Sequence, residues 1–478
     1  MNARRVVVIG HGMAGSRVAS EVRRRDPLGE RVALTVVGAE PHPAYNRVLL
    51  SAVLAGALKP DEVTLQDSVW AADNDVSLLT GVSVVRVNRS LRCVSLSDGT
   101  SVAYDALVLA TGSTAWIPPT DGLLGSDGSL ASGVVPFRTV DDCAAIVSLA
   151  RPGAPVAVLG GGLLGLEAAR GLAGRGNAVT VVHPVGHLME RQLDPAAGAM
   201  LASTLGTLGI EFRLGRLATE YVPGDGLVLD DGSFVPADLV VVSAGVRPDV
   251  ALASDAGLSV DRGVVVDDAL RTSDPRVYAL GDCAQHRGSV GGLVQPAWEQ
   301  ASVVADLLCG TNPASRYSGT PVVTRLKAKG VELTALGDVH DDSPDVELLR
   351  FEDARRGRYA KLVLRSDRVV GAIMLGAPDA AAAVAQLYDS GSLVPEDRLG
   401  LLLGRAVGVA SAGPADQPDD AVVCRCNTVT KGALVSAWES GATSVPGLAD
   451  ATRATTGCGG CKGAVTRITE WLATRQPA

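Results

Sequence analysis

Two stretches of the chain decide its fold, VVVIGHGMAG at residues 6–15 and VAVLGGGLLG at residues 156–165. In each, a run of β-branched and apolar residues typical of a buried strand leads into a Gly-x-Gly-x-x-Gly turn, and a helix-forming stretch follows. Such glycines permit a tight turn and a close approach of backbone to a pyrophosphate, which then faces the helix N-terminus. One such turn is a weak signal, but two in one chain predict an α/β protein with two Rossmann-like dinucleotide-binding domains. The glycines of the two turns are Gly10, Gly12, Gly15, Gly160, Gly162 and Gly165.

A polar residue follows or ends the second predicted strand of each domain, where a ribose would lie. VALTVVG is followed by Glu40, a candidate for the first ribose contact, with a surface carboxylate as the alternative. AVTVVH ends at His183, where an NAD-preferring site usually places Asp or Glu. Arg191 lies downstream, but no tight basic pair marks a 2′-phosphate pocket. The sequence therefore leaves both NADH and NADPH open as the second dinucleotide.

Three further stretches indicate a flavin. They are DALVLATG (105–112), LVVVSAGVRPD (239–249) and TSDPRVYALGD (272–282). Thr111 and Gly112 form a small-residue turn at which the backbone can cross close to the first nucleotide. With these stretches and the two glycine turns, the chain resembles the two-dinucleotide-binding flavoprotein family, the FAD/NAD-linked reductases. The resemblance implies bound FAD in a glutathione-reductase-like arrangement. It also implies that Asp282, after Gly281, hydrogen-bonds the ribityl chain or pyrophosphate region of FAD, with an ordinary turn residue as the alternative.

The same resemblance separates this chain from some branches of the family. No cysteine precedes Cys93, so the flavin–dithiol relay of the disulfide reductases is not expected. The loop PHPAYNRVLLSAVL contains Arg47, a candidate contact for FAD phosphate or ring, with a salt-bridged loop arginine as the alternative. Ser51 is followed by Ala52, where many ferredoxin-reductase relatives carry lysine. Trp298 falls where relatives place a helix N-terminus near the flavin carbonyl, so it is a candidate flavin contact or a plain core tryptophan.

Half of the eight cysteines are clustered near the C-terminus. The clustered ones are Cys424, Cys426, Cys458 and Cys461, while those at 93, 143, 283 and 309 are isolated and expected to be small buried residues. The pattern C-x-C, 31 residues, C-x-x-C is tighter in its first pair than structural zinc sites usually are. Together with the GCGGCKG loop, it resembles the bacterioferritin-associated-ferredoxin type of [2Fe–2S] domain. That resemblance implies that the four clustered thiolates hold a [2Fe–2S] cluster, with zinc as the alternative.

Two helices are expected around these cysteines. Thr428 or Thr430 can cap a helix that runs to about Trp438, and Lys462 begins another that runs to about Leu472. Both cysteine pairs are thereby expected at helix N-termini, whose N–H groups favour thiolates and the negative charge of a reduced cluster.

The motifs divide the chain into five parts. The expected parts are a discontinuous FAD-binding domain (1–113 and 243–312), an NAD(P)-binding domain (114–242), a small α+β interface domain (313–403), a flexible linker (404–421) and a small helical [2Fe–2S] domain (422–478). Alternating strands such as YAKLVL and RVVGAIML favour the α+β assignment, and the run GRAVGVASAGPADQPDDA favours the linker.

Composition excludes some classes of partner. A net charge of −9 with 3% aromatic residues argues against nucleic-acid binding. No apolar run approaches the ~20 residues that span a bilayer, so no membrane is expected. The first apolar run breaks into glycines after four residues, which reads as a strand rather than a signal peptide. A cytoplasmic protein is expected.

The order of these parts extends the resemblance along nearly the whole chain. VVVIGHGMAG, EPHPAYNRVLLS, TVVHPVGHLMERQLD and the cysteine module occur in the same order in the flavoproteins of assimilatory nitrate and nitrite reduction. The resemblance implies an NAD(P)H-dependent electron-transfer component that passes electrons from NAD(P)H to FAD, to the [2Fe–2S] cluster, and on to a separate nitrate or nitrite reductase catalytic subunit. No further cysteine set for a sirohaem cluster follows, so the chain is not expected to reduce nitrite itself. Two alternatives stay open: a component of an FAD-dependent amino-acid or opine dehydrogenase, and a zinc-held docking or redox-sensing module.

Overall fold

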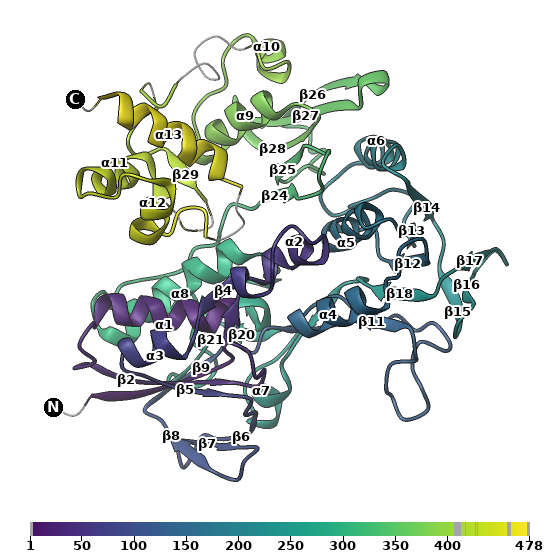
Figure 1. The fold of residues 1–478 in the computed structure, drawn as a ribbon. Helices are drawn as coiled ribbons and strands as arrows, with labels where there is room; N and C mark the ends of the chain where they lie inside the picture. The colour runs from purple at the N-terminus through teal and green to yellow at the C-terminus, as the bar shows by residue number, and fades with distance from the viewer. Residues whose placement is uncertain are drawn as a thin grey trace. The chain divides into compact units, whose positions relative to one another are not determined.

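The computed structural model describes residues 3–405, 413–415, 417–425, 427, 429–456 and 460–475. The chain divides into two compact units (Figure 1). The first comprises Met1–Leu49, Lys59–Thr114 and Val246–Thr320, and the second comprises Leu50–Leu58, Ala115–Gly245 and Pro321–Ala478.

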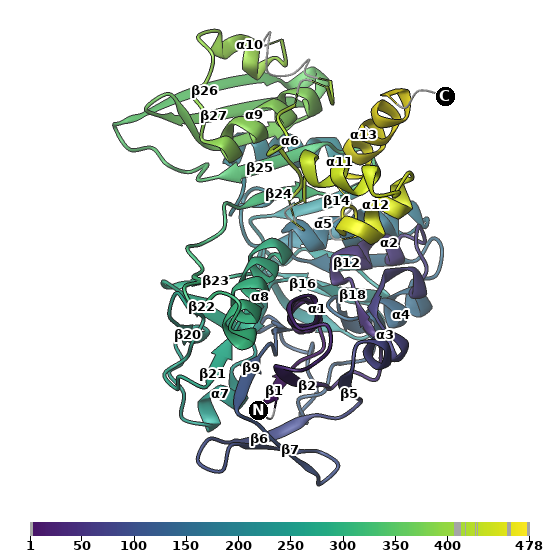
Figure 2. The same ribbon diagram turned by 90° about the vertical axis from the view of Figure 1, so that its left-hand side faces the viewer.

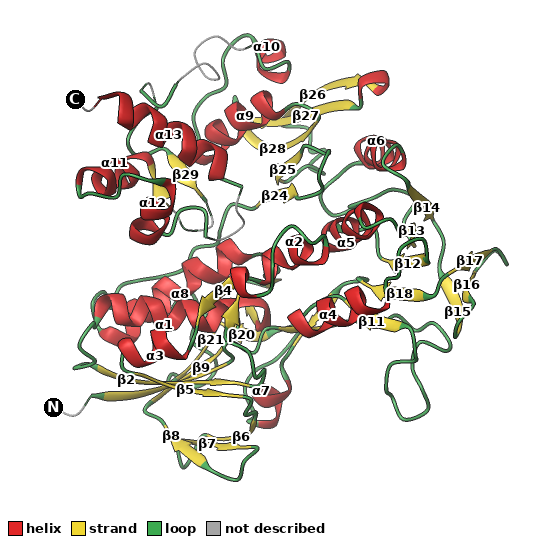
Figure 3. Cartoon of the chain, in the orientation of Figure 1, coloured by secondary structure: helices red, strands yellow, loops and turns green. Residues whose placement is uncertain are grey.

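The first unit is built on a parallel five-stranded sheet in the order β21-β9-β1-β2-β5. The strands are β1 (Arg4–Ile9), β2 (Val32–Gly38), β5 (Val76–Thr80), β9 (Ala106–Leu109) and β21 (Val277–Ala279). Helices α1 (Met13–Arg25) and α8 (Val294–Cys309) pack together on one face, and the antiparallel sheet of β6 (Val84–Asn88), β7 (Cys93–Leu96) and β8 (Ser101–Ala103) lies on the other (Figures 1 and 3). Because both faces are covered, the last four residues of β1 and all of β9 are buried and apolar.

Shorter elements complete this unit. They are β3 (Ala44–Tyr45), η1 (Arg47–Leu49), η2 (Asp61–Val63), β4 (Thr64–Gln66), α3 (Ser68–Asp73), β10 (Ser113–Ala115), β19 (Val246–Pro248), α7 (Ala251–Asp255), β20 (Val264–Val266), η3 (Gly281–Cys283), β22 (Ala284–His286) and β23 (Ser289–Val290).

The second unit repeats this plan in its first part. A parallel sheet has the order β11-β18-β12-β13-β14, formed by β11 (Val134–Pro136), β12 (Pro155–Leu159), β13 (Ala178–His183), β14 (Ile210–Leu214) and β18 (Leu239–Val242). Helices α2 (Leu50–Leu54), α4 (Val140–Leu149), α5 (Leu163–Gly174) and α6 (Pro195–Gly206) belong to this part. The small sheet of β15 (Ala218–Val222), β16 (Gly226–Leu229) and β17 (Phe234–Pro236) shares its core, as the three-stranded sheet does in the first unit.

Two smaller parts follow in the same unit (Figure 2). An antiparallel sheet of order β24-β25-β28-β27-β26 buries one face against α9 (Pro378–Ser390). Its strands are β24 (Val323–Leu326), β25 (Leu333–Gly337), β26 (Val346–Asp353), β27 (Arg358–Arg365) and β28 (Arg368–Leu375), with η4 (Ala354–Arg356) and α10 (Arg398–Leu402) beside them. The last part contains β29 (Val422–Cys424), β30 (Val429–Thr430), α11 (Lys431–Glu439), α12 (Val445–Thr452) and α13 (Lys462–Arg475). Much of the expected linker, residues 406–412 and 416, lies outside the described residues. None of the described helices is long and apolar enough to cross a membrane.

Tyr359 connects the antiparallel sheet to the dinucleotide-binding part of the same unit. Its fully buried hydroxyl donates a 2.6 Å hydrogen bond to the carboxylate of Asp194, the N-cap of α6. Burial, reinforced by the carboxylate, raises the pKa of Tyr359, so the hydroxyl keeps its proton.

Tyr359→Phe is therefore expected to weaken α6 locally. Loss of a buried hydrogen bond to a charged acceptor lowers the free energy of local opening by about 1–3 kcal/mol. Native-state hydrogen exchange at the α6 amides measures this quantity. Tyr221→Phe is the matched control, because Tyr221 donates to the neutral carbonyl oxygen of Ser132 and lies away from α6 in the sequence. Equal exchange at α6 in the Tyr359 variant and the parent would contradict this role.

Candidate functional site: two dinucleotide turns and a cysteine module

In the first glycine turn, two of the three glycines lie too close to neighbouring backbone atoms to carry a side chain. Gly10 follows β1 with φ +107°, and a Cβ there would lie 2.2 Å from the carbonyl oxygen of Ala110. A Cβ on Gly15 would lie 1.8 Å from the carbonyl oxygen of Gly10. At Gly12, in contrast, the nearest atom to an added Cβ is Nε of Arg47 at 3.9 Å. Gly10 and Gly15 are thus required by the fold, whereas Gly12 keeps its side open for a ligand.

The second turn has the same geometry. Gly160 has φ +123°, and its Cβ would lie 2.2 Å from the carbonyl oxygen of Ser243. A Cβ on Gly165 would lie 2.1 Å from the carbonyl oxygen of Gly160, while one on Gly162 would meet no atom within 4 Å. The chain therefore builds the same cradle twice, once in each unit.

The helices after these turns begin without a capping side chain. Their N-caps are Gly12 for α1 and Gly162 for α5, and neither first turn contains an acidic residue. By comparison, α4 begins with a capping box at Thr139, and Asp194 caps α6. Since the first N–H groups of a helix have no partner within it, those of α1 and α5 are available to an anion such as a pyrophosphate.

Glu40 and Arg47 lie together beside the first turn. Their side chains form an ion pair, and the hydroxyl of Tyr45 donates a 2.7 Å hydrogen bond to the Glu40 carboxylate. The guanidinium of Arg47 also stacks over the Tyr45 ring, 5.1 Å from its centre. The salt bridge left open as the alternative for Arg47 is therefore present. Because an arginine carries five N–H donors, this pairing is compatible with a phosphate contact.

In the first unit, hydrogen bonds connect Thr111 and Gly112 to Asp249, and the next residue, Ser113, to Asp282. The Thr111 hydroxyl donates to the carbonyl oxygen of Asp249 at 2.7 Å, and the Gly112 carbonyl accepts from the Asp249 N–H at 2.9 Å. Ser113 donates to the Asp282 carboxylate at 2.9 Å. Sequence reasoning missed Ser113, whose only signal was its place directly after Gly112.

Gly281 brings Asp282 to the start of α1. A Cβ on Gly281 would lie 3.0 Å from that of Ala14, and its N–H donates to the side chain of Gln300 at 2.8 Å. Gln300 belongs to α8 and was also missed, because nothing near it in the sequence marks it.

Trp298 is almost fully buried. It is 2% exposed, its indole N–H donates to the carbonyl oxygen of Met13 at 3.2 Å, and the guanidinium of Arg17 stacks on its ring. Too little of the ring is accessible for stacking on a flavin. The structure therefore favours the core interpretation over the predicted flavin contact.

His183 lies at the end of β13, as predicted, but its ring points inward. It is 5% exposed, its Nδ1 accepts a hydrogen bond from the Gly161 N–H at 3.1 Å, and its Nε2 lies 3.1 Å from a carboxylate oxygen of Glu190. Burial lowers the pKa of His183. With both ring nitrogens engaged, His183 is a support for Glu190 rather than the direct cofactor contact predicted from its position. Glu190 was missed, because it lies in a loop with no periodic pattern.

A buried carboxylate occurs early in α5. Glu167 is 4% exposed, accepts a 2.7 Å hydrogen bond from the Ser51 hydroxyl, and accepts another from the Lys327 N–H at 3.1 Å. The ammonium of Lys327 lies 3.8 Å from the same carboxylate. The sequence showed only that Ala52 stands where many ferredoxin-reductase relatives carry lysine. In the structure, Lys327, which is distant in sequence, pairs with Glu167 within the second unit.

Two of the four clustered cysteines lie within the described residues. Cys424 is fully buried at the end of β29, and the side-chain amide of Asn427 donates toward its sulfur at 3.8 Å. Cys461 directly precedes α13, and its carbonyl accepts the first hydrogen bond of that helix, from Val465. Cys426 and Cys458 lie outside the described residues. Buried thiols with an amide donor fit an iron–sulfur ligand set.

The expected placement at helix N-termini holds for Cys461 and is wrong for Cys424. Helix α11 begins only at Lys431, because Thr430 caps it by accepting from the Ala433 N–H. Cys424 lies instead in the strand that precedes this helix. In the described part of the chain, no group of three or more His, Cys, Asp or Glu side chains is placed to hold a metal ion.

Arg425, beside Cys424, is anchored on α9. It forms an ion pair with Asp389 and donates to the carbonyl oxygen of Ala385 at 2.9 Å. Burial raises the pKa of Asp389. Arg425, which follows Cys424 in the chain, is therefore held against the antiparallel sheet domain.

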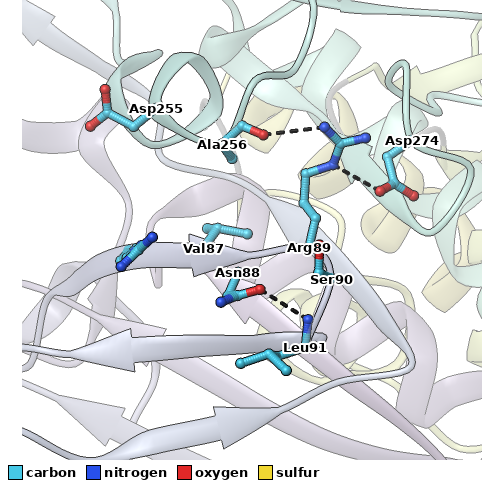
Figure 4. A pocket seen from close by; sticks show the side chains of 9 residues that line it. Val87, Asn88, Arg89, Ser90, Leu91, Asp255, Ala256 and Asp274 are labelled. Carbon is cyan, nitrogen blue, oxygen red and sulfur yellow. Dashed lines mark hydrogen bonds and ion pairs between the residues drawn. The ribbon is translucent and has the colours of Figure 1, made fainter.

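A pocket of about 640 Å³ lies in the first unit (Figure 4). One of its two arginines, Arg89, donates to the Asp274 carboxylate at 2.9 Å and to the carbonyl oxygen of Ala256 at 3.2 Å. The pocket is lined by Arg86, Val87, Asn88, Arg89, Ser90, Leu91, Asp255, Ala256 and Asp274. None of these residues was predicted to bind a cofactor, and the pocket offers no group for redox chemistry.

Duplicated nucleotide cradles followed by a cysteine module define a pyridine-nucleotide-linked flavoprotein reductase with an iron–sulfur domain. The chain belongs to the pyridine nucleotide-disulphide oxidoreductase family, which it matches over residues 4–301. Residues 322–391 match the rubredoxin NAD⁺ reductase C-terminal domain, and residues 422–471 match the BFD-like [2Fe–2S] binding domain. These matches confirm the predicted fold class, the FAD and NAD(P)H cofactors, and the [2Fe–2S] cluster over zinc.

The chain is also similar to individual curated proteins. The chain is 37% identical over 475 residues to the nitrite reductase [NAD(P)H] of Bacillus subtilis, covering 98% of this chain and 58% of that protein. It is 35% identical to the assimilatory nitrate reductase electron transfer subunit of the same organism, covering 99% of this chain and 60% of that protein. The chain thus spans less than two thirds of the length of these two relatives. It also covers 93% of the rubredoxin-NAD(+) reductase of Pseudomonas putida, at 33% identity.

Solved structures share the fold. The structure of the putidaredoxin reductase–putidaredoxin complex aligns with a TM-score of 0.72 at 27% identity, covering 84% of this chain and 94% of that one. A ferredoxin reductase from Rhodopseudomonas palustris aligns with a TM-score of 0.73 at 26% identity, covering 82% and 96%.

Proposed function

We propose that this chain is the NAD(P)H-dependent electron-transfer component of an assimilatory nitrate or nitrite reductase. It would take electrons from NAD(P)H and deliver them through FAD and a [2Fe–2S] cluster to a separate catalytic subunit. The observation that carries the proposal is the presence, in one chain, of two uncapped helix N-termini at glycine turns and of the cysteine module. The names of the two Bacillus subtilis relatives support the nitrogen-oxide acceptor.

We assign each cofactor to its own residues. FAD would be held by the domain of residues 1–113 and 243–312, and NAD(P)H by residues 114–242. The residues proposed for FAD are Gly10, Gly12, Gly15, Glu40, Arg47, Thr111, Gly112, Gly281 and Asp282, those for NAD(P)H are Gly160, Gly162, Gly165 and the pair His183–Glu190, and those for the cluster are Cys424, Cys426, Cys458 and Cys461.

The protein's own contribution is to bind and orient. When bound, FAD accepts a hydride from the nicotinamide and releases the electrons one at a time to a one-electron centre. The N–H groups that begin α1 and α5 would bind the two pyrophosphates. Burial of Cys424 limits the access of water to its sulfur, which affects the cluster potential. A cytoplasmic location fits both NAD(P)H as donor and four reduced thiols.

The intact second turn argues against a substrate-oxidising dehydrogenase. An enzyme that draws electrons from an amino acid or opine has little use for a second dinucleotide cradle. Here Gly160 and Gly165 keep the close backbone contacts that exclude any side chain, as their counterparts do in the first unit. This duplication favours NAD(P)H as the electron donor.

Reconstitution with isolated catalytic subunits tests the proposal. The FAD- and cluster-loaded chain is mixed anaerobically with NADH or NADPH and with a nitrate reductase or a nitrite reductase catalytic subunit. Nitrite from nitrate, or ammonium from nitrite, is expected only when both proteins are present. Rubredoxin serves as the competing acceptor. Reduction of rubredoxin with no transfer to either catalytic subunit would overturn the assigned partner, and flavin reduction by amino acids alone would overturn the assigned donor.

A further inference from the structure

We propose that Glu190, held in place by His183, binds the adenosine ribose of the nicotinamide cofactor and selects NADH over NADPH. The inference deepens the proposed function and rests on the assignment of the second glycine turn to this cofactor. In a Rossmann domain, an acidic side chain that follows the first βα unit reads the ribose hydroxyls from the end of the second strand. Here that strand is β13, and the carboxylate comes from the loop behind it.

The loop after β13 folds back onto the glycine turn. The Met189 N–H donates to the carbonyl oxygen of Gly161 at 3.0 Å, and Met189 itself adopts φ +52°. Leu188 is fully buried, and a Cβ on Gly161 would lie 2.8 Å from its side chain. These contacts fix the backbone directly before Glu190 next to the glycine turn. Glu190 itself remains accessible, with its side chain 34% exposed.

His183 fixes the direction of the carboxylate. A backbone N–H can only donate, so the bond from Gly161 makes Nδ1 of His183 an acceptor. The neutral ring then carries its proton on Nε2, which lies 3.1 Å from the Glu190 carboxylate and donates to it. Because this bond occupies one side of one oxygen, the remaining lone pairs of the carboxylate stay available to ribose hydroxyls.

Two neighbouring arginines pair with carboxylates other than Glu190. Arg213 lies 3.4 Å from Glu211, and Nε of Arg216 lies 2.6 Å from Asp231. Arg191 lines a separate small cavity of about 90 Å³ together with Val322, Thr324 and Ala335 and other residues of the antiparallel sheet domain. Glu190, in contrast, is the charged side chain that the bond from His183 holds beside the glycine turn.

A carboxylate at this position discriminates in two ways. It accepts hydrogen bonds from the 2′- and 3′-hydroxyls of NADH, which are strong because the acceptor is charged. Against NADPH it places a negative charge beside the 2′-phosphate, which repels that group. The geometry thus selects NADH both by attraction and by repulsion.

Binding of non-redox fragments tests the inference without relying on turnover. The FAD-loaded full chain is titrated calorimetrically with ADP-ribose and with 2′-phospho-ADP-ribose, and the ratio of the two dissociation constants is measured. The parent protein is expected to prefer ADP-ribose by at least about tenfold, and Glu190→Gln is expected to reduce this ratio about tenfold. His183→Phe, which keeps a ring but removes both nitrogens, is expected to reduce the ratio as well.

Glu347→Gln is the matched control, since Glu347 lies on β26 of the antiparallel sheet domain, is 46% exposed and also forms an ion pair, with Arg398, which is not one of the arginines discussed near the second turn. Its ratio is expected to equal that of the parent. If both fragments bind and Glu190→Gln leaves the ratio unchanged, or if the parent prefers the phosphorylated fragment, the role of Glu190 is overturned while the cofactor site stands. If neither fragment binds the parent, the assignment of the second turn fails together with this inference.

Discussion

Cys461→Ser is expected to lower the NADH-dependent reduction of one-electron protein acceptors roughly 100-fold, because it removes one of the four thiolates proposed to hold the cluster. Transfer of electrons to a two-electron dye is expected to remain within about twofold of the parent, since hydride acceptance depends on the two nucleotide cradles. Cys461 lies directly before α13, so the substitution changes a ligand without touching the interior of a helix. The ratio of the two activities in anaerobic steady-state assays measures the effect.

Cys93→Ser is the matched control. Cys93 is a half-buried free thiol in β7 of the first unit, and the account gives it no part in electron transfer. Its variant is expected to keep both activities and the visible absorption of the cluster. If Cys461→Ser retains the parent rate with a protein acceptor, electrons do not leave through the cysteine module.

The second large effect is expected at the NAD(P)H cradle, where two neighbouring glycines should respond differently to alanine. Gly162→Ala is expected to weaken NADH binding about tenfold or more while leaving the thermal midpoint unchanged. An added Cβ there meets no protein atom within 4 Å, and φ −82° suits alanine, so the methyl group intrudes only on the space left for the pyrophosphate. Gly160→Ala is expected to lose binding and also several kcal/mol of stability, because its Cβ would lie 2.2 Å from a carbonyl oxygen at φ +123°.

Fluorescence titration with NADH and thermal unfolding of the FAD-loaded protein separate the two effects. Gly12→Ala supplies the corresponding change in the first unit, where an added Cβ has 3.9 Å to the nearest atom. That variant is expected to lose FAD and to keep a folded second unit. A Gly162→Ala protein that binds NADH like the parent would show that the second turn does not hold a pyrophosphate.

The features predicted correctly from the sequence are those encoded locally. The glycine spacing is one, because the strand, turn and helix are consecutive, and the first and third glycine of each turn lie against a nearby backbone carbonyl. The expected second strand VALTVVG is β2 (Val32–Gly38), for the same reason. The cysteine pattern is another, since its spacing and the GCGGCKG loop carried the resemblance to a [2Fe–2S] domain that the family match supports.

Side-chain partners distant in sequence could not be predicted in this way. The position of His183 at a strand end was clear, but its inward orientation depends on the Gly161 N–H and on the loop that carries Glu190. Lys327 partners Glu167 across 160 residues, and Ser113 partners Asp282 across 169. Such contacts depend on how separate elements pack, which no local pattern encodes.

Trp298 and Cys424 show how packing decides the surroundings of a single residue. Trp298 was expected to be either a flavin contact or a plain core tryptophan, and its burial depends on the packing of α8, which carries it, against α1. Cys424 was expected at a helix N-terminus because α11 follows, but Thr430 caps that helix first. For Cys424, the helix and its cap at Thr430 were predicted correctly, and the place of the cysteine in the preceding strand was not.

The central claim is that electrons from a nicotinamide reach the cysteine module through the flavin. An anaerobic titration of the complete FAD- and cluster-loaded chain with NADH, followed by visible absorption and electron paramagnetic resonance, tests it most directly. The account predicts that the flavin band near ~450 nm bleaches and that the signal of a reduced [2Fe–2S] centre appears in the same titration. Bleaching of the flavin with a cluster that stays oxidised, or no response to NADH at all, would contradict the account.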